Sequence, residues 1–300
     1  MGPRTWVPGL LATALLWDQA RRSHLRHRRS SASGPVREAA VRASLEETSP
    51  PDAPFVAIVI AALNEEATIG KVLADIPEML CGLRVRVLVV DDGSTDSTAE
   101  VARAAGALVS SHGRNLGQGD GLRTGFAVAL ELGATVVVTM DADGQHDPAE
   151  LPDLVGPVLG GDADYVQGSR FLGKYDDAGG ARHVGIMGFT ALINVLAGTR
   201  VSDCTNGYRA IAGSELGRMR LVEDRFSAAE IIIEAAACGL RIREVPVHIR
   251  GREVGETRKP RGLSYPLGYL GTIVRSSVRA RALNSRSHRS SAHSRSGVRL

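Results

Sequence analysis

Apolar runs rich in β-branched residues alternate with helix-like patterns along the chain from residue 55 onward. The runs cover residues 55–61, 86–90 and 134–140, with a shorter one at 107–110. Between them, apolar residues recur at helical spacing over 68–80, 97–105 and 119–132. This alternation is typical of an α/β fold with a mostly parallel sheet and helices on both faces, and unbroken apolar strands indicate burial on both sides.

Polar and acidic side chains follow three of the expected strands. They are Asn64 and Glu66 after the first strand, Asp91 and Asp92 after the second, and Asp141 and Asp143 after the run at 134–140. Ligands of open α/β sheets bind beyond the carboxyl ends of the strands, so these positions predict one ligand-binding rim. Each acid taken alone is equally explained as a helix cap, because Asp and Ser favour that position.

The sequence Asp141-Ala142-Asp143 predicts a metal site. Carboxylates two positions apart on an extended chain point to the same side. Mg²⁺ and Mn²⁺ prefer oxygen ligands, commonly one or two carboxylates together with substrate phosphates. The pair therefore predicts a cation that carries a phosphorylated ligand. A glycine-rich stretch at 113–121 is a weak phosphate-loop signal, since it matches neither the Walker A nor the dinucleotide-binding pattern.

Taken in order, the motifs resemble the catalytic domain of glycosyltransferase family 2, which has the GT-A fold. The segments are AALNEE at 61–66, VVDDGSTDST at 89–98, GRNLGQGDGLRTG at 113–125, MDADGQHDP at 140–148, GSR at 168–170, SDCTNGYRAI at 202–211 and EVPVHIRGREVGETR at 244–258. The resemblance covers about residues 55–270. Within the family, the chain is most similar to the dolichyl-phosphate mannosyltransferase, or polyprenyl-phosphate glycosyltransferase, type.

The resemblance implies a role for individual residues. A donor nucleotide sugar would be bound by Leu63, Asn64, Glu66, Asp91, Asp92, Gly117, Asp141 and Ala142, with Asp91 or Asp92 on the base or ribose. The metal would be held by Asp141, Asp143 and Gln145, with Asp143 as the most direct ligand. Catalysis and acceptor binding would involve Asp143, Arg170, Arg182 and Asp203. The two arginines are also explained as surface ion pairs, and Asp203 as a turn residue.

The expected activity is metal-dependent, inverting transfer of a hexose from GDP-mannose or a UDP-sugar to a polyprenyl or dolichyl phosphate. Such an acceptor is already anionic and needs cations rather than a base, and the planar fork of arginine suits phosphate oxygens. Alternatives remain open: a soluble, cell-wall or natural-product acceptor, a retaining transferase, a nucleotidyltransferase, or a non-catalytic nucleotide-sugar-binding protein.

Charge is distributed unevenly. Residues 1–30 carry +5 and residues 275–300 carry +7, so in a chain of net charge +3 the residues between them carry −9. Basic ends on an acidic body suggest peripheral binding to an anionic membrane, and no nucleic-acid-binding module is visible. Three widely spaced cysteines favour a reducing compartment, so we expect a cytoplasmic location, peripheral on the membrane face.

Three regions are expected. Residues 1–54 comprise an apolar run at 6–17, too short to span a bilayer, followed by basic residues and a flexible linker from residue 30. Residues 55–270 form the catalytic domain. Residues 271–300 complete an amphipathic basic helix begun near 264, which either lies on a membrane or packs on the domain, and end in a disordered tail from about residue 284.

Overall fold

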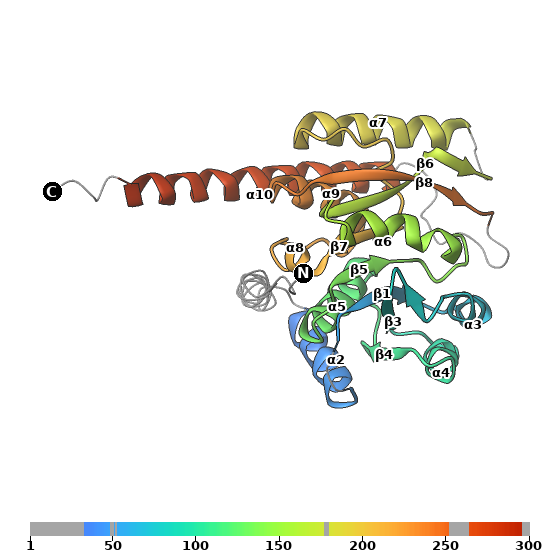
Figure 1. Ribbon diagram of the computed structural model, residues 1–300. Coiled ribbons are helices and arrows are strands. Elements are labelled where there is room, and N and C mark those ends of the chain that lie inside the picture. Colours follow the sequence, from blue (N-terminus) through green and yellow to red (C-terminus); the bar gives the residue numbers. More distant parts are fainter. Residues whose placement is uncertain (1–32, 49–50, 52, 177–179, 252–263, 296–300) are drawn as a thin grey trace, which may run out of the picture.

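The computed structural model describes residues 33–48, 51, 53–176, 180–251 and 264–295. An eight-stranded sheet runs through the molecule in the order β2-β3-β1-β5-β7-β6-β8, with β4 paired to β3 beside β2 (Figure 1). The strands are β1 (Phe55–Ala62), β2 (Met79–Leu80), β3 (Leu83–Asp91), β4 (Leu108–Ser111), β5 (Val136–Thr139), β6 (Tyr165–Tyr175), β7 (Arg209–Ala212) and β8 (Ile242–Ile249).

The first half of the sheet is parallel, as the alternating pattern predicts. β1 pairs in parallel with β3 on one side and with β5 on the other, and β3 pairs in parallel with β4. The second half is mixed, because β7 runs antiparallel to both β5 and β6 while β8 lies parallel to β6. The carboxyl ends of β1, β3, β4 and β5 therefore meet at one rim, where the acidic residues lie.

Helices cover both faces of the sheet. They are α2 (Gly34–Glu46), α3 (Glu66–Ala74), α4 (Thr98–Ala104), α5 (Gln118–Glu131), α6 (Leu151–Leu159), α7 (Gly180–Ala197), α8 (Gly213–Leu216), α9 (Ser227–Ala237) and α10 (Ser264–Arg295), with the 3₁₀ turn η2 (Pro148–Glu150) before α6. Among the described helices, none has a stretch long and apolar enough to cross a bilayer.

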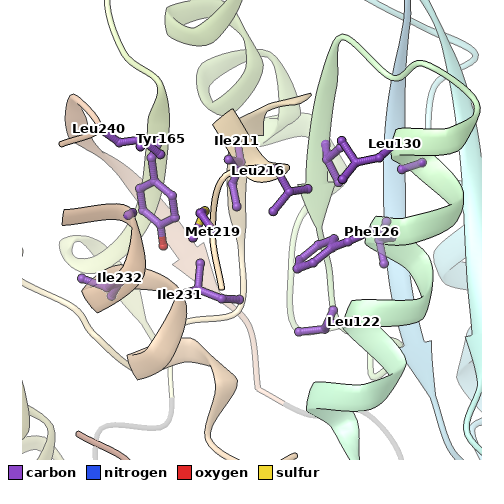
Figure 2. Packing of buried hydrophobic residues seen from close by; sticks show 14 of the residues in the cluster. Leu122, Phe126, Leu130, Tyr165, Ile211, Leu216, Met219, Ile231, Ile232 and Leu240 are labelled. Atoms are coloured by element: carbon purple, nitrogen blue, oxygen red, sulfur yellow. The ribbon is translucent and has the colours of Figure 1, made fainter. Parts of the chain in front are cut away.

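Alternate residues of each central strand enter two separate cores. In β1, Ala57 and Val59 face a core built by α5, α9 and α10, whereas Ile58 and Ile60 face one built by α3, α4 and α6. Successive side chains of a strand point to opposite faces, so an unbroken apolar strand supplies both cores at once. Figure 2 shows the first core, in which Phe126 of α5 lies fully buried.

The structure differs from the sequence expectations at three places. The helix expected over 68–80 ends at Ala74, and Pro77 follows before β2. The linker expected over 30–54 contains the helix α2, which buries Arg37, Ala40 and Val41. The tail expected to be disordered from about residue 284 continues as helix α10 up to Arg295. The apolar run at 6–17 lies outside the described residues.

Candidate active site

The loop after β1 is tied to the loop after β3 by reciprocal hydrogen bonds. Asn64, which adopts a left-handed backbone with φ 48°, donates its N–H to Ser94 Oγ at 2.8 Å and accepts the Thr95 N–H on Oδ1 at 2.7 Å. Glu66 Oε2 accepts the N–H of Ser97 at 2.9 Å. Asn64 and Glu66 thus brace the rim where we expected donor binding, and Leu63 lies half-buried beside them.

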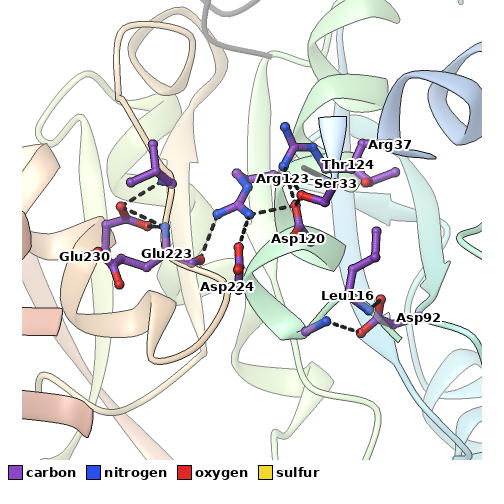
Figure 3. A network of polar contacts seen from close by, with 12 residues as sticks. Ser33, Arg37, Asp92, Leu116, Asp120, Arg123, Thr124, Glu223, Asp224 and Glu230 are labelled. Atoms are coloured by element: carbon purple, nitrogen blue, oxygen red, sulfur yellow. Dashed lines mark hydrogen bonds and ion pairs between the residues drawn. The ribbon is translucent and has the colours of Figure 1, made fainter. Parts of the chain in front are cut away.

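The adjacent acids Asp91 and Asp92 have different tasks. Asp91 Oδ1 accepts the N–H of Ser94 at 2.9 Å and so closes the turn after β3. Asp92 accepts the N–H of Leu116 on Oδ1 at 2.9 Å and that of Gly117 on Oδ2 at 2.8 Å, as drawn in Figure 3.

The imidazole of His112 completes the surroundings of Asp92. Its Nδ1 lies 2.7 Å from Asp92 Oδ1, and its Nε2 lies 2.8 Å from Thr124 Oγ1 on α5. With both carboxylate oxygens engaged by protein groups, Asp92 organises the glycine-rich loop. Its expected contact with a donor stays a prediction.

Close packing explains the glycine-rich stretch. A Cβ at Gly125 would lie 2.3 Å from Val59 Cγ1, and one at Gly119 would lie 2.0 Å from Glu223 O. Gly117 has φ 101°, and a Cβ there would lie 2.7 Å from Asp224 O. These glycines let α5 approach β1 and the 223–224 loop closely. The expected donor contact of Gly117 stays a prediction.

The predicted metal ligands lie together on the turn after β5. Asp141 is the more open, with 38% of its side chain exposed, while Asp143 is 8% exposed and accepts the N–H of Gln145 at 3.2 Å. Gln145 donates Nε2–H to Arg250 O at 2.8 Å, which leaves its amide oxygen as a potential ligand. Ala142 is buried, so only its backbone can reach a donor.

Two carboxylates and an amide oxygen are the hard donors that Mg²⁺ or Mn²⁺ prefers, so this turn fits such a cation. The described residues contain no group of three or more His, Cys, Asp or Glu side chains arranged for a metal. A cation here would accordingly complete its coordination with ligand oxygens. Sequence reasoning missed Gln118, whose Nε2 donates to Asp141 Oδ1 at 3.3 Å; nothing in its spacing marked it.

His146 is a structural member of this turn. Its Nδ1 accepts the N–H of Asp141 at 3.1 Å, so Nε2 carries the proton and donates to Asn206 Oδ1 at 3.0 Å. The ring also stacks on Tyr208, with centroids 4.6 Å apart. Both nitrogens are engaged, so His146 joins the Asp141–Gln145 turn to the segment around Asn206.

Arg170 and Asp203, which were expected on the acceptor side, form a buried ion pair. Arg170 Nε donates to Asp203 Oδ2 at 2.6 Å, and a second guanidinium nitrogen donates to Thr205 Oγ1 at 3.1 Å. The other oxygen of Asp203 accepts from the N–H and Oγ1 of Thr205 at 3.1 and 3.2 Å. Asp203 has no exposed surface. The Arg170 guanidinium also lies over the Tyr175 ring, 4.9 Å from its centroid.

The segment 203–208 connects these two groups. Asp203 and Thr205 hold Arg170, while Asn206 binds His146 and a Cβ at Gly207 would lie 3.1 Å from the Asp141 carboxylate. The structure therefore brings the acidic turn and the arginine to opposite ends of one short segment. The side chain of Arg182 lies outside the described atoms, and its predicted role stays a prediction.

A charge network fastens α2 and the 223–224 loop to α5 (Figure 3). Asp120 accepts from Arg37 of α2 and from Arg123, the latter at 2.6 Å, and Arg123 also donates to Asp224 Oδ1 at 2.7 Å. Burial favours a neutral carboxyl, but the two guanidinium groups outweigh it and hold the pKa of Asp120 below its ordinary value. No sequence pattern predicted this network, because helix α2 was not expected.

Comparisons with known proteins agree with this arrangement. The family described as "Glycosyl transferase family 2" matches residues 57–214. A dolichyl-phosphate hexose transferase of Haloferax volcanii is 36% identical over 202 residues, which cover 67% of this chain and 85% of that protein. An undecaprenyl-phosphate mannosyltransferase of Micrococcus luteus is 33% identical over 207 residues, covering 65% of this chain and 82% of that protein.

Solved structures support the fold. The glucosyl-3-phosphoglycerate synthase of Mycobacterium tuberculosis, in complex with phosphoglyceric acid, superposes with a TM-score of 0.57 at 24% identity, covering 82% of this chain and 84% of that one. The expected GT-A fold is confirmed by this likeness and by the mixed sheet. From its motifs, its fold and its relatives, the chain is a glycosyltransferase and belongs to glycosyltransferase family 2.

Proposed function

We propose that the protein transfers a hexose, with inversion, from a nucleotide-diphosphate sugar to a polyprenyl or dolichyl phosphate. The observation that carries the proposal is the segment 203–208, which links a carboxylate turn suited to a metal diphosphate with a buried arginine suited to an acceptor phosphate. Two relatives bear names that state a dolichyl-phosphate or undecaprenyl-phosphate activity, which supports this acceptor class.

On the donor side, Asp141, Asp143 and Gln145 would hold Mg²⁺ or Mn²⁺. A divalent cation bound there would neutralise the negative charge that develops on the departing nucleoside diphosphate. The protein contributes orientation: His146 anchors the Asp141 backbone, and Asn64 and Glu66 brace the neighbouring loop where the nucleotide would lie. Of the two acids after β3, we assign the nucleotide contact to Asp91, because Asp92 is occupied by the loop it holds.

On the acceptor side, the environment of Asp203 supports a phosphate over a hydroxyl acceptor. A hydroxyl needs a base within hydrogen-bond reach, but Asp203 is fully buried and both its oxygens accept from Arg170 or Thr205. An acceptor phosphate is anionic and needs a fixed cation. Asp203 and Thr205 hold Arg170 in one orientation, in which its guanidinium would bind phosphate oxygens.

The test is release of nucleoside diphosphate and formation of lipid-phosphate sugar from GDP-mannose and UDP-sugars, with Mg²⁺ or Mn²⁺. Asp143→Ala should lower the rate by roughly a hundredfold or more, because it removes a ligand of the charge-neutralising cation. Asp153→Ala, an exposed acid on α6, is the matched control and should be unchanged. Equal rates for the two variants would refute the metal assignment.

The acceptor class has its own measurement. Arg170→Lys keeps the charge but loses the planar fork, so it should raise the KM for lipid phosphate more than the KM for the donor. Transfer to 3-phosphoglycerate or a free sugar, with none to lipid phosphate, would contradict the acceptor. The anomeric configuration of the product, determined by NMR, tests inversion.

A lipid acceptor implies that the enzyme works at a membrane surface, and we propose a peripheral cytoplasmic location. Relatives named for lipid-phosphate substrates support this placement. The basic N-terminal residues and the last five residues lie outside the described part of the chain, so their proposed attraction to anionic lipid rests on charge alone.

A further inference from the structure

Helix α2 is docked by buried contacts on α5 and β4. Val41 belongs to the core that contains Phe126 of α5, and Ser44 Oγ meets Ser110 Oγ of β4 in a buried hydrogen bond. The family matches residues 57–214, so α2 lies before that part of the chain and the match assigns it no role. What α2 does for the protein therefore depends on the partners that it meets.

Two buried arginines share one carboxylate where α2 meets α5, as Figure 3 shows. Asp120 is 1% exposed, and its Oδ1 accepts from Arg37 of α2 and from Arg123 at 2.6 Å. Ser33 Oγ, directly before α2, donates to the same oxygen at 3.1 Å. Water cannot replace partners at this depth, so the sharing of Asp120 decides how strongly it holds each arginine.

Arg123 also holds the 223–224 loop. Its Nη1 donates to Glu223 O at 2.8 Å. Its Nη2 serves two carboxylates at once, since it lies 2.6 Å from Asp120 Oδ1 and 2.7 Å from Asp224 Oδ1. The two acids therefore compete for one nitrogen. Because Arg37 neutralises much of the charge of Asp120, Arg123 can hold Asp224 as well.

That loop bears directly on the glycine-rich stretch. The N–H of Gly119 donates to Asp224 O at 2.9 Å, and a Cβ at Gly117 would lie 2.7 Å from the same oxygen. Between the two glycines lies Gln118, whose Nε2 donates to Asp141 Oδ1 at 3.3 Å. A displacement of the loop would therefore move Gln118 relative to the turn that we expect to bind the metal.

The opposite side of the loop is anchored independently. Arg275 of α10 donates to Glu223 Oε2 at 2.6 Å, and Glu230 of α9 accepts the N–H of Val222 at 2.8 Å. Loss of the Arg123 contact would leave the loop attached to α9 and α10 but released from α5. The expected result is a local shift beside the donor side of the site, while the domain stays folded.

We propose that Arg37 of α2 is a positioning residue for the donor side of the active site. By neutralising Asp120, it leaves Arg123 available to hold the 223–224 loop, and the loop keeps the glycine-rich stretch in place. Without Arg37, Asp120 would draw Arg123 away from the loop. The inference rests on the proposed function, because it takes the turn at Asp141 as the place where the metal and the nucleoside diphosphate bind.

The experiment measures the KM for the donor and the KM for the acceptor in Arg37→Met, which keeps an unbranched apolar stem and removes the charge. We expect the donor KM to rise about tenfold and the acceptor KM to stay unchanged. Partial unfolding would lower the number of active molecules, and thus kcat, but not the KM of those that remain folded. Arg42→Met is the matched control, because Arg42 is exposed on the same helix, and its donor KM should equal that of the wild type.

A double variant tests the competition between the two carboxylates. In Arg37→Met/Asp120→Asn the charge that would draw Arg123 away is removed as well, so Arg123 stays with Asp224. The donor KM should then return to within about twofold of the wild-type value. A purely structural role of α2 predicts the opposite, because the double variant has lost more of the contacts that dock the helix.

Three outcomes overturn the proposal: a wild-type donor KM in Arg37→Met, an equal rise in Arg42→Met, or a double variant as impaired as Arg37→Met. Calorimetry of UDP and GDP binding in the presence of Mn²⁺ separates this inference from the proposed function. If Kd follows the expected pattern but the wild type transfers to no lipid phosphate, the proposed function fails and the inference stands. If the wild type transfers and the variants all match it, the inference alone fails.

Hydrogen exchange gives a measurement that needs no ligand. The amide of Gly119, which is bonded to Asp224 O, should exchange faster in Arg37→Met and near the wild-type rate in the double variant. A protein that shows this pattern but binds no nucleotide would refute the proposed donor site and leave the coupling of α2 to the loop standing. Unchanged exchange of Gly119 in Arg37→Met would refute the coupling.

Discussion

Replacing Asp203 by Asn distinguishes two roles for this carboxylate: holding Arg170 in position, or acting as a general base. The substitution keeps the shape of the side chain but removes its charge, and the new amide donor must face one of the donors that Asp203 now accepts from. These donors include Arg170 Nε at 2.6 Å on one side and the N–H of Thr205 at 3.1 Å on the other. Asp203 is not exposed at all, so water cannot replace the lost partner on the side of Arg170 that faces it.

The expected cost follows from that burial. Removing one partner of a buried ion pair generally costs about 3–5 kcal/mol, because the remaining charge stays buried without compensation. For a chain of this size such a loss lowers Tm by roughly 10 °C. Asp164→Asn is the matched control: Asp164 pairs with Arg241 at 2.6 Å, but that arginine is 59% exposed. An exposed pair contributes about 1 kcal/mol or less.

Urea unfolding measures the stability, and pH–rate profiles of the two variants and wild type measure the role in catalysis. We expect Asp203→Asn to lose stability and acceptor affinity while the acidic limb of the profile keeps its position. The reasoning is refuted if Asp203→Asn is as stable as Asp164→Asn yet loses about 10²–10⁴-fold in kcat together with its acidic limb. That result would make Asp203 a general base.

Three further predictions follow from other parts of the structure. Gly125→Ala should destabilise the fold by about 1–3 kcal/mol in urea unfolding, because its Cβ would lie 2.3 Å from Val59, whereas Gly156→Ala, whose Cβ meets nothing within 4 Å, should be neutral or stabilising. Asp92→Ala removes the hydrogen bonds to the N–H groups of Leu116 and Gly117, which should lower the free energy of unfolding by about 1–3 kcal/mol and raise the donor KM by about tenfold. An unchanged donor KM in steady-state kinetics, or an unchanged donor Kd in calorimetry, would refute the loop assignment. Burial raises the pKa of Glu230 to about 7, although the hydrogen bond from the Val222 N–H and the charge of Arg279 both lower it. Arg279 is shared with the carboxylates of Glu223 and Glu234. A carboxyl with a raised pKa binds its proton more tightly in the folded state, so its contribution to the free energy of unfolding is present at low pH and lost as pH rises through about 7. Between pH 5 and 8 the wild type should therefore lose stability relative to Glu230→Gln.

Much of the sheet was predictable because strand and helix periods are local. The apolar runs that form β1, β3, β4 and β5 lie within a few residues of their expected positions, and Asp141, Asp143 and Gln145 share the expected turn. The mixed half was harder, because the reversal of β7 depends on pairing with β5 and β6, which are distant in sequence.

Residue roles were less predictable where they depend on tertiary partners. Gly117 and Gly119 belong to the stretch with a weak phosphate-loop pattern, but a Cβ at either would meet the backbone of the 223–224 loop. Likewise, Arg275 and Arg279 have the pattern of a membrane-facing helix, yet they bind Glu223 and Glu230. A sequence shows that a charge is present on a helix face, but only the packing shows which partner it meets.

The attachment of α2 leads us to expect two levels of cooperativity in unfolding. Its buried ion pair joins Arg37 to Asp120 across 83 positions of chain, and no pairing of the sheet passes through it. We therefore predict that α2 detaches while every strand stays paired, in a sub-global opening of lower free energy than full unfolding. Amide hydrogens of α2 would then exchange with solvent before those of α5. If so, α2 and the remainder of the described domain have separate stabilities, and a single melting temperature reports mainly on the second.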